Sequence, residues 1–431
     1  MFKKYDNYKD SGLEWLGDIP SEWGVKRVKD IGSVKGRVGW KALKASEYVD
    51  KSEYIFIATP NIKYKNIDFK NVNYLTKERY EESPEIMLKS NDIVLTKDGS
   101  TLGTVNIIKD LPSKTTVNSS IAVLRFKTIN NKFMFYQIKS EYIQNIVKLK
   151  KDGAGVPHLF QKDINDFKIV LPPLKTQTKI ATYLDTQTQK IDKEIQLLEE
   201  KSLKYKELKQ TLINETVLRG LDKGVKLKDS GIEWIGDIPE GWEVKRGKDI
   251  YKYNKIINKK LECKNVLSLT YNGVINKDYN RASGLNPDSY DTYQFVNTNN
   301  LIFKLIDLEN IKTSRVGLVH ENGIMSSAYI RLKQSNNIFS KYFYYLYFYY
   351  YKINLFNNLG GGVRATLNYT GLLNINIIKP PLKDQQKIAL YLDKKTQIID
   401  NIIKTISKKI KLLKEFRKTL INDVVTGKVK I

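Results

Sequence analysis

The side chains that most often carry out catalysis or bind metals are few in this sequence and lie far apart. There are two histidines, His158 and His320, and a single cysteine, Cys263. A structural zinc site needs Cys and His ligands at close sequence spacing, so none is predicted. Neither histidine lies in a nucleophile elbow, which argues against Ser-His-Asp chemistry. One cysteine allows no intramolecular disulfide and does not imply an oxidising compartment.

Motifs for nucleotide chemistry are missing as well. The sequence has no GxxxxGK[ST] segment, and its two Pro-Pro pairs read LPPL and KPPL. These pairs lack the polar and aromatic residues with which an amino-methyltransferase holds an extruded base. Glu262-Cys263-Lys264 matches the ExK half of a metal-dependent nuclease motif, but Pro287-Asp288 follows it instead of preceding it. We therefore predict no catalytic residue, no metal ligand and no cofactor bound by this chain.

The net charge indicates a polyanionic partner. Seventy-three Lys and Arg residues against 47 Asp and Glu give a formal net charge of +26. An excess of this size is typical of proteins that bind nucleic acid. A Lys-rich proteome from an AT-rich genome is the alternative, but it explains Lys in place of Arg better than it explains the shortage of acids.

Nothing in the sequence predicts a membrane segment. No apolar stretch follows the opening MFKKYDNYKD, and no run of about 18 apolar residues occurs. The richest run, Tyr342–Tyr351, is short and full of phenols, which favours an amphipathic or buried helix. We expect a cytoplasmic protein.

The chain is a tandem duplication. DSGLEWLGDIPSEWGVKR (Asp10–Arg27) returns as DSGIEWIGDIPEGWEVKR (Asp229–Arg246). IVLPPLKTQTKIATYLDTQTQKID (Ile169–Asp192) returns as IIKPPLKDQQKIALYLDKKTQIID (Ile377–Asp400). The repeated phrase holds Trp15, Trp23, Trp234 and Trp242, which we interpret as anchors of each repeat rather than as readers of a ligand.

The two regions inside these repeats, roughly 32–168 and 251–376, barely resemble each other. Both have short alternating or apolar runs around Gly turns, followed by a segment of helical spacing (Asn131–Lys150 in the first), so we predict α+β domains. A repeated frame around two dissimilar inserts suggests one scaffold that carries two recognition regions, each for a different target.

Each Pro-Pro pair should end a strand and lead into a long helix. Apolar residues then alternate by three and four positions, which is the pattern of a coiled-coil seam. A helix with one apolar stripe needs a partner, and the second helix of the same chain can supply it in an antiparallel pair. Two separate arms that bind other proteins are the alternative. The predicted helix-pairing residues are Leu184, Ile191, Ile195, Leu198 and Leu212 in the first half and Leu392, Ile399, Ile403, Ile406, Ile410, Leu413 and Leu420 in the second. The polar interruptions of this pattern are Ser202 and Lys209 in the first half and Thr396 and Arg417 in the second.

Basic residues beside glycines are the candidates for DNA contact, because glycine lets the backbone approach a phosphate while Arg and Lys reach base edges. A solvated basic loop or a plain hairpin is the alternative at each place. The candidates are Arg37, Trp40 and Lys41 in KGRVGWKALK, Lys97, Ser100 and Thr101 in TKDGSTLG, Lys312, Thr313, Ser314 and Arg315 in IKTSRVG, and Arg364 in GGGVRATL.

The duplicated order of motifs resembles the specificity subunit of type I restriction-modification systems. The resemblance rests on SGxEWxGxIPxxWxVKR, a variable region, and PPLxxQxKIAxYLDxxTxxID with its long helix, all present twice. The segments GRVGWKALKASEYVD and DIVLTKDGSTLG also look like parts of that family's target-recognition domains. One departure is that Val156-Pro157 in the first glycine loop becomes Val363-Arg364 in the second.

The resemblance implies an α+β fold in which two target-recognition domains are joined by two long helices that pair as an antiparallel coiled coil, with pseudo-two-fold symmetry. The expected parts are residues 1–172, the spacer helix 173–222, residues 223–379 and the spacer helix 380–431. Each domain would read one half of a bipartite, asymmetric site in double-stranded DNA. The expected partners are two methyltransferase subunits and two motor-nuclease subunits, which would carry S-adenosylmethionine, ATP and Mg.

Two other hypotheses remain open from the residues alone. The chain can be a coiled-coil adaptor that meets nucleic acid only through charge, in which case its binding would depend on salt and be blind to sequence. It can also be a free-standing DNA-binding regulator, in which case the isolated chain would bind one sequence tightly.

Overall fold

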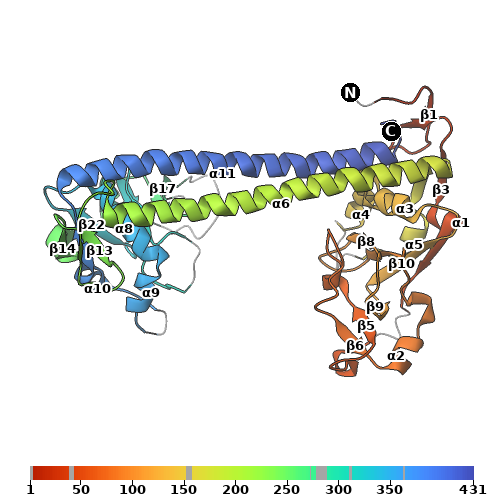
Figure 1. The fold of residues 1–431 in the computed structure, drawn as a ribbon, viewed down its shortest axis with the longest axis horizontal. Coiled ribbons are helices and arrows are strands. Elements are labelled where there is room, and N and C mark those ends of the chain that lie inside the picture. Colours follow the sequence, from red (N-terminus) through yellow and green to blue (C-terminus); the bar gives the residue numbers. More distant parts are fainter. Residues whose placement is uncertain are drawn as a thin grey trace. The chain divides into compact units, whose positions relative to one another are not determined.

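The chain folds into two compact units. The first comprises residues 1–199 and 408–431, and the second residues 200–407. Each long helix therefore gives one part to each unit. The computed structural model describes residues 3–37, 43–151, 158–271, 273–277, 289–309, 313–362 and 365–431 (Figure 1).

The elements of the first half, in chain order, are β1 (Tyr8–Asp10), β2 (Asp18–Pro20), β3 (Gly24–Arg27), α1 (Val28–Ile31), β4 (Gly32–Lys35), β5 (Tyr54–Ile57), β6 (Asn73–Leu75), α2 (Lys77–Glu81), β7 (Ile93–Thr96), β8 (Val105–Ile107), β9 (Lys114–Val117), β10 (Ile121–Phe126), α3 (Asn131–Lys139), α4 (Glu141–Lys151), α5 (Gln161–Asn165), β11 (Lys168–Leu171) and α6 (Leu174–Arg219).

The elements of the second half are β12 (Leu227–Asp229), β13 (Asp237–Pro239), β14 (Glu243–Arg246), α7 (Gly247–Ile250), β15 (Tyr251–Tyr253), β16 (Leu267–Thr270), β17 (Gly273–Asn276), β18 (Gln294–Val296), β19 (Leu301–Phe303), β20 (Val316–Leu318), β21 (Gly323–Met325), β22 (Ile330–Gln334), α8 (Ser340–Lys352), α9 (Leu355–Leu359), α10 (Tyr369–Asn374), β23 (Asn376–Lys379) and α11 (Leu382–Val425).

Both units contain the same four-stranded antiparallel sheet. Its order is β4-β10-β7-β8 in the first unit and β15-β22-β19-β20 in the second. In both, the strand of the repeated phrase pairs with the strand before the Pro-Pro pair, β3 with β11 and β14 with β23. The inserts differ elsewhere: the first adds the sheet β6-β5-β9, and the second adds the pairs β16-β17 and β18-β21. The predicted tandem α+β fold is confirmed.

The Pro-Pro pairs end strands and precede helices, as predicted. β11 ends at Leu171 and α6 begins at Leu174, directly after Pro172-Pro173. β23 ends at Lys379, and α11 begins at Leu382 after the second pair. Proline cannot donate to the next ladder hydrogen bond, yet it fits the first turn of a helix.

The segment Asn131–Lys150, expected as one helical run, is broken at Ser140. α3 ends at Lys139 and α4 begins at Glu141. Ser140 has extended backbone angles, and its hydroxyl accepts a 3.4 Å hydrogen bond from the backbone N–H of Ile143. A serine in this position caps the new helix, and the local cap outweighs the continuous apolar periodicity.

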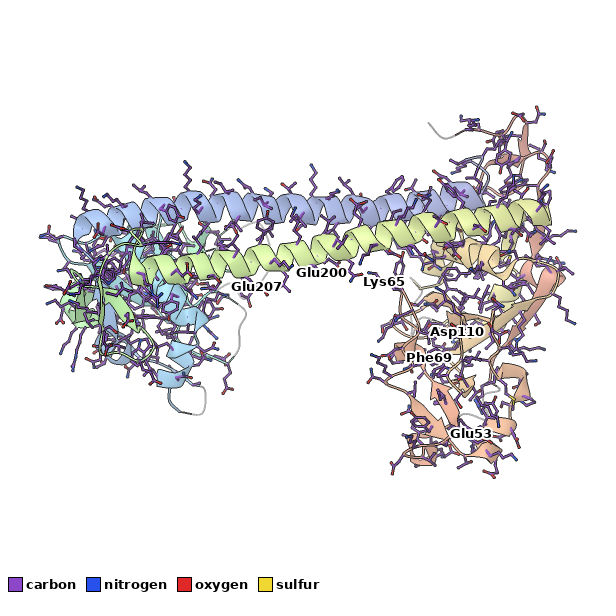
Figure 2. All side chains as sticks on the ribbon, viewed as in Figure 1. Glu53, Lys65, Phe69, Asp110, Glu200 and Glu207 are labelled. Atoms are coloured by element: carbon purple, nitrogen blue, oxygen red, sulfur yellow. The ribbon has the colours of Figure 1, made fainter. Side chains whose placement is uncertain are left out.

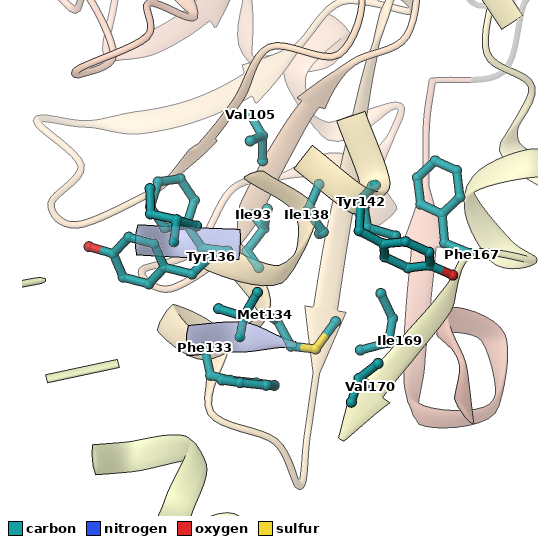
Figure 3. Close-up of a cluster of buried hydrophobic side chains, with 14 of the residues drawn as sticks. Ile93, Val105, Phe133, Met134, Tyr136, Ile138, Tyr142, Phe167, Ile169 and Val170 are labelled. Carbon is teal, nitrogen blue, oxygen red and sulfur yellow. The ribbon is translucent and has the colours of Figure 1, made fainter. Parts of the chain in front are cut away.

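α3 and α4 pack on the four-stranded sheet and form the core of the first unit. Ile93 of β7 and Val105 of β8 meet Met134 and Ile138 of α3, while Tyr142 of α4 lies nearer to Phe167 (Figure 3). The core continues into the long helices through Ile180, Leu184, Ile191, Ile195, Leu420, Ile421, Val424 and Val425.

In the first unit α6 and α11 run antiparallel, because the start of one and the end of the other meet the same short helix. The backbone N–H of Asn130 donates to Gln177 Oε1 at 3.0 Å, and Gln137 Nε2 donates to the Val425 carbonyl at 2.7 Å. Of the predicted pairing residues here, Leu184, Ile191, Ile195 and Leu420 are buried and Leu198, Ile410 and Leu413 are half-buried.

The second unit repeats this arrangement around α8. The Tyr342 hydroxyl donates to the Val217 carbonyl near the end of α6, and the Phe339 N–H donates to Gln385 Oε1 near the start of α11, both at 2.8 Å. Leu392, Ile399 and Ile406 are buried, and Leu212 and Ile403 are half-buried. Charged side chains such as Glu200 and Glu207 occupy exposed positions of α6 (Figure 2).

One contact between the insert and the long helix occurs in both units, although the two inserts differ in sequence. A tyrosine on the short helix donates to an aspartate on the long helix: Tyr136 to Asp185 at 2.7 Å, and Tyr345 to Asp393 at 2.8 Å. A lysine one turn earlier, Lys132 or Lys341, pairs with the same aspartate at 2.6 Å in both units. Burial raises the pKa of Tyr136 and Tyr345 well above the ordinary value, so both hydroxyls keep their proton and donate it. The repeated frame thus includes α3 and α8.

The repeated phrase anchors the ends of the long helices. Trp23 and Trp242 are buried, and each packs against the glycine that follows a long helix, Gly427 and Gly220 respectively. Both glycines have positive φ, +81° and +76°, as expected where a helix ends in a left-handed residue. The other two tryptophans differ, since Trp15 is 61% exposed and Trp234 is half-buried.

Throughout the residues that the structure describes, every helix is too short or too polar to cross a membrane.

Candidate nucleic-acid interface

The predicted segment TKDGSTLG forms the turn between β7 and β8. The N–H of Lys97 donates to the Ser120 carbonyl at 2.8 Å, and its own carbonyl accepts from Leu159 N–H at 2.8 Å. Ser100 and Thr101 are exposed at the tip of this turn. Two of the predicted contact residues are thus open to a ligand, while the Lys97 backbone is fixed on both sides.

The same turn is tied to the residue after the first glycine loop. The His158 imidazole contacts the Asp98 carboxylate, the two residues form an antiparallel bridge, and Lys97 Nζ lies 3.7 Å from the other Asp98 oxygen. The structure therefore joins the Lys97 turn to the segment that begins at His158. No contact between these two segments is predicted from the sequence.

Arg37 is folded into the first unit. Only 4% of it is exposed, and its Nε donates to the Val117 carbonyl at 3.5 Å. Burial, together with the nearby Arg79 guanidinium, lowers the pKa of Arg37. In this conformation its side chain is not presented at the surface. Trp40 and Lys41 lie outside the described residues.

The predicted counterpart in the second unit is buried as well. Arg315 is 1% exposed, with Nη1 and Nη2 donating to the carbonyls of Ile306 at 3.3 Å and Asp307 at 2.8 Å. The buried Ser314 hydroxyl donates to the Val316 carbonyl at 2.8 Å, and Thr313 is half-buried. In this conformation Arg315 stabilises a bend before β20. Lys312 and Arg364 lie outside the described residues.

A group of basic residues that the sequence did not single out lines an open cavity of about 480 Å³ in the first unit. Lys139 comes from the end of α3, Lys148 from α4 and Lys418 from α11. They lie far apart in the chain, so no local motif reveals them. The one sequence signal is that Lys418, in the matching helix segments, stands where the other repeat has Gln210.

The described residues contain no group of three or more His, Cys, Asp or Glu that would hold a metal ion. The candidate surfaces carry the Ser100 and Thr101 hydroxyls and the Lys139, Lys148 and Lys418 ammonium groups, beside the carboxylates of Asp98 and Glu141. The hydroxyl and ammonium groups donate hydrogen bonds and suit an anionic ligand such as a phosphate backbone.

Comparison with known proteins identifies a family. The model of the type I restriction modification DNA specificity domain matches twice, over residues 20–200 and 239–412. Each match covers one insert together with part of the repeated frame around it.

Relatives with curated names match along the whole chain. The MjaVIII specificity subunit of a type I restriction enzyme from Methanocaldococcus jannaschii is 26% identical over 100% of this chain and 98% of its own. The putative MjaX specificity subunit of the same organism is 25% identical over the same shares. These names agree with the prediction of a specificity subunit rather than a catalytic chain.

Solved structures share the fold. A chain from a study of complex assembly and conformational transition of the type I R-M system aligns with a TM-score of 0.69 at 14% identity, over 95% of this chain and 99% of the other. The HsdS subunit from Thermoanaerobacter tengcongensis aligns with a TM-score of 0.51 at 13% identity, over 95% and 98%.

Proposed function

Because the chain belongs to the family of type I restriction modification DNA specificity domains, we propose that it reads a bipartite, asymmetric DNA site, one half with each unit. The observation that carries this proposal is the pairing of a repeated frame with two different inserts. The four-stranded sheet and the strand pairs β3-β11 and β14-β23 recur, whereas the sheets added around them do not. A shared frame would present both inserts to one duplex, and unlike inserts would select unlike bases.

The long helices would set the distance between the half-sites and dock two methyltransferase subunits. Exposed charged residues on α6, such as Glu200 and Glu207, leave that helix a polar face for partner chains. Two motor-nuclease subunits would complete the complex. The partner subunits would bind S-adenosylmethionine, ATP and Mg. The role of the present chain would be to select the DNA sequence.

Contacts to DNA would come from the Lys97 turn and from the loops around it. Ser100 and Thr101 are exposed there, and the formal net charge of +26 would support phosphate contacts over a wide surface. Trp40, Lys41, Lys312 and Arg364 remain predictions for the same role.

The test is a methylation map of a host that carries this chain and its methyltransferase partner, compared with a host that lacks only this chain. We expect one split, asymmetric motif to disappear when the chain is absent. Replacing residues 32–168 with the insert of another specificity subunit should change one half of the motif, and replacing 251–376 should change the other.

An unchanged map in a host with active methyltransferase would contradict the proposal. Binding that depends on salt but is equal for all duplexes would then favour the adaptor hypothesis.

A further inference from the structure

The basic cavity of the first unit is lined by residues from five elements or loops. Its wall includes Tyr64 from the loop after β5, Thr104 at the start of β8, Lys139 at the end of α3, Lys148 on α4 and Lys418 on α11. A volume of about 480 Å³ falls in the range of small-ligand sites. The Tyr64 side chain is 50% exposed, so its ring is accessible in the wall.

Positive charge at this cavity exceeds what the nearby carboxylates neutralise. Lys139 Nζ lies 3.1 Å from the Tyr64 carbonyl and 4.2 Å from the centre of the Tyr64 ring. Arg417 also contacts Tyr64, with Nη1 donating to the Tyr64 hydroxyl at 3.0 Å. The Asp192 carboxylate is occupied by Arg417, whose Nη2 lies 3.1 Å away. Burial is the main cause that lowers the pKa of Lys139 to about 7, and the neighbouring Arg417 guanidinium lowers it further.

The fold does not require lysine at positions 139 and 418, because the other repeat has other residues there. The shared Tyr–Asp contacts align Tyr136 with Tyr345, which places Lys139 opposite Phe348. The matching TLIN segments align Lys418 with Gln210. Lysines at these two positions are therefore particular to the first unit, which indicates a function there.

We propose that this cavity binds a phosphate group, and that the group belongs to the backbone of the DNA bound by this chain. The assignment of the phosphate to DNA rests on the proposed function, whereas phosphate binding by the cavity does not. The Lys139, Lys148 and Lys418 ammonium groups would contact the phosphate oxygens, and the Tyr64 ring would pack against the adjoining sugar or base. A phosphate contact of this kind adds affinity without reading sequence.

The first measurement is DNA affinity as a function of salt, with the full chain in complex with its methyltransferase partner. The test variant combines Lys139→Met with Lys418→Gln, the second of which is the residue of the other repeat. The matched control removes one charge from an exposed position of α6 in the same unit, Lys193→Gln. We expect the test variant to reduce the slope of log affinity against log salt by about 1, equally for duplexes with and without the recognised site. The control should leave the slope unchanged.

The second measurement is the pH dependence of the same affinity. A bound phosphate favours the charged form of Lys139, so the pKa rises in the complex and binding takes up a proton. Affinity should therefore fall by up to tenfold per pH unit as the pH rises above about 7, and Lys139→Met should remove this dependence. The charged and titratable groups that face Lys139 or line the same cavity are Arg417, Asp192, Tyr64, Glu141, Lys148 and Lys418.

A third measurement, the melting temperature with inorganic phosphate or ATP, distinguishes a free phosphate compound from the DNA backbone. If these compounds raise the melting temperature of the native chain but not of the test variant, and the salt dependence of DNA affinity is the same for both, the cavity binds a free phosphate compound. The proposal that the phosphate belongs to DNA would then be wrong. If a folded test variant changes neither response, the site itself is refuted. A changed slope together with an unchanged methylation map would support the cavity while contradicting the proposed function.

Discussion

At the scale of single residues, a bidentate ion pair in the first unit joins Arg125 and Asp92. Arg125 Nε and Nη2 each lie 2.8 Å from one Asp92 oxygen, and Nη1 donates to the Glu85 carbonyl at 2.9 Å. The Asp92 side chain is only 6% exposed. Such a bidentate pair fixes β10 to the segment before β7, because two parallel hydrogen bonds hold the guanidinium and the carboxylate in one geometry.

Arg125→Met should lower the free energy of unfolding by about 3 kcal/mol, since it leaves a buried carboxylate without its partner. Urea denaturation of the full chain measures this loss. The matched control is Lys411→Met, which breaks an exposed pair with Glu415 and should cost under about 0.5 kcal/mol. Equal losses from the two variants would show that the Asp92 site takes up water when Arg125 is removed.

The burial of a charged side chain is not visible in its local sequence. A loop with Gly, Lys and Arg is typical of an exposed basic turn, yet Arg37 and Arg315 donate to carbonyls of Val117, Ile306 and Asp307. Val117 lies 80 positions from Arg37, so local composition carries no information about that contact. Ser100 and Thr101 are exposed because a tight turn between adjacent strands leaves its tip in solvent.

At the scale of elements, ion pairs occupy two of the predicted polar interruptions of the helix seam. Arg417 pairs with Asp192 at 3.1 Å in the first unit, and Lys209 pairs with Asp400 at 2.7 Å in the second. The two pairs are equivalent under the internal repeat, since Asp192 aligns with Asp400 and Lys209 with Arg417. A polar residue inside an apolar seam favours one register of the helices over its neighbours.

A double-mutant cycle with Arg417→Met and Asp192→Asn should give a coupling of about 2 kcal/mol, because the Arg417 side chain is 7% exposed. The equivalent cycle with Lys209→Met and Asp400→Asn should give about 0.5 kcal/mol, because the Asp400 side chain is 56% exposed. Thermal or urea unfolding of the four variants of each cycle provides the values. A stronger coupling in the second unit would contradict the idea that burial decides the difference.

The long helices were predictable, and the cavity beside them was not. Residues such as Leu184, Ile191 and Leu392 repeat at helical spacing, and each Pro-Pro pair marks a helix start through local sterics. The cavity instead needs Tyr64, Lys139 and Lys418, which come together only after the sheet, α3 and α11 have packed. The spacing of apolar residues shows which face of a helix is buried. It does not show which distant element packs against that face.

At the scale of the whole molecule, the two ends of the chain are joined within the first unit. Lys3 and Lys430 form an antiparallel bridge, and Lys430 Nζ lies 3.1 Å from Asp6 Oδ2. The Tyr8 hydroxyl donates to the Gly427 carbonyl at 3.2 Å. The last turn of α11 therefore closes on the first repeated phrase, as the end of α6 closes on the second.

Gly427→Ala tests this closure. A Cβ at Gly427 would lie 2.3 Å from Pro20 Cδ, and the residue has a φ of +81°. We expect a loss of about 2–4 kcal/mol in the stability of the first unit, from overpacking and from the left-handed backbone. Gly12→Ala is the control, because Gly12 has a φ of +66° but no atom within 4 Å of its Cβ position, and it should cost only about 1 kcal/mol. Comparable melting temperatures for the two variants would argue against a clash with Pro20.

The core of the first unit has an implication for protein synthesis. Leu420, Ile421, Val424 and Val425 belong to that core, although they are translated some two hundred residues after the helix α6 that they cover. Until residues 420–425 have been synthesised, the first unit exposes the apolar surface that they will bury, and that surface needs protection from aggregation. A prematurely terminated product would keep that surface exposed and should be a substrate for chaperones and proteases.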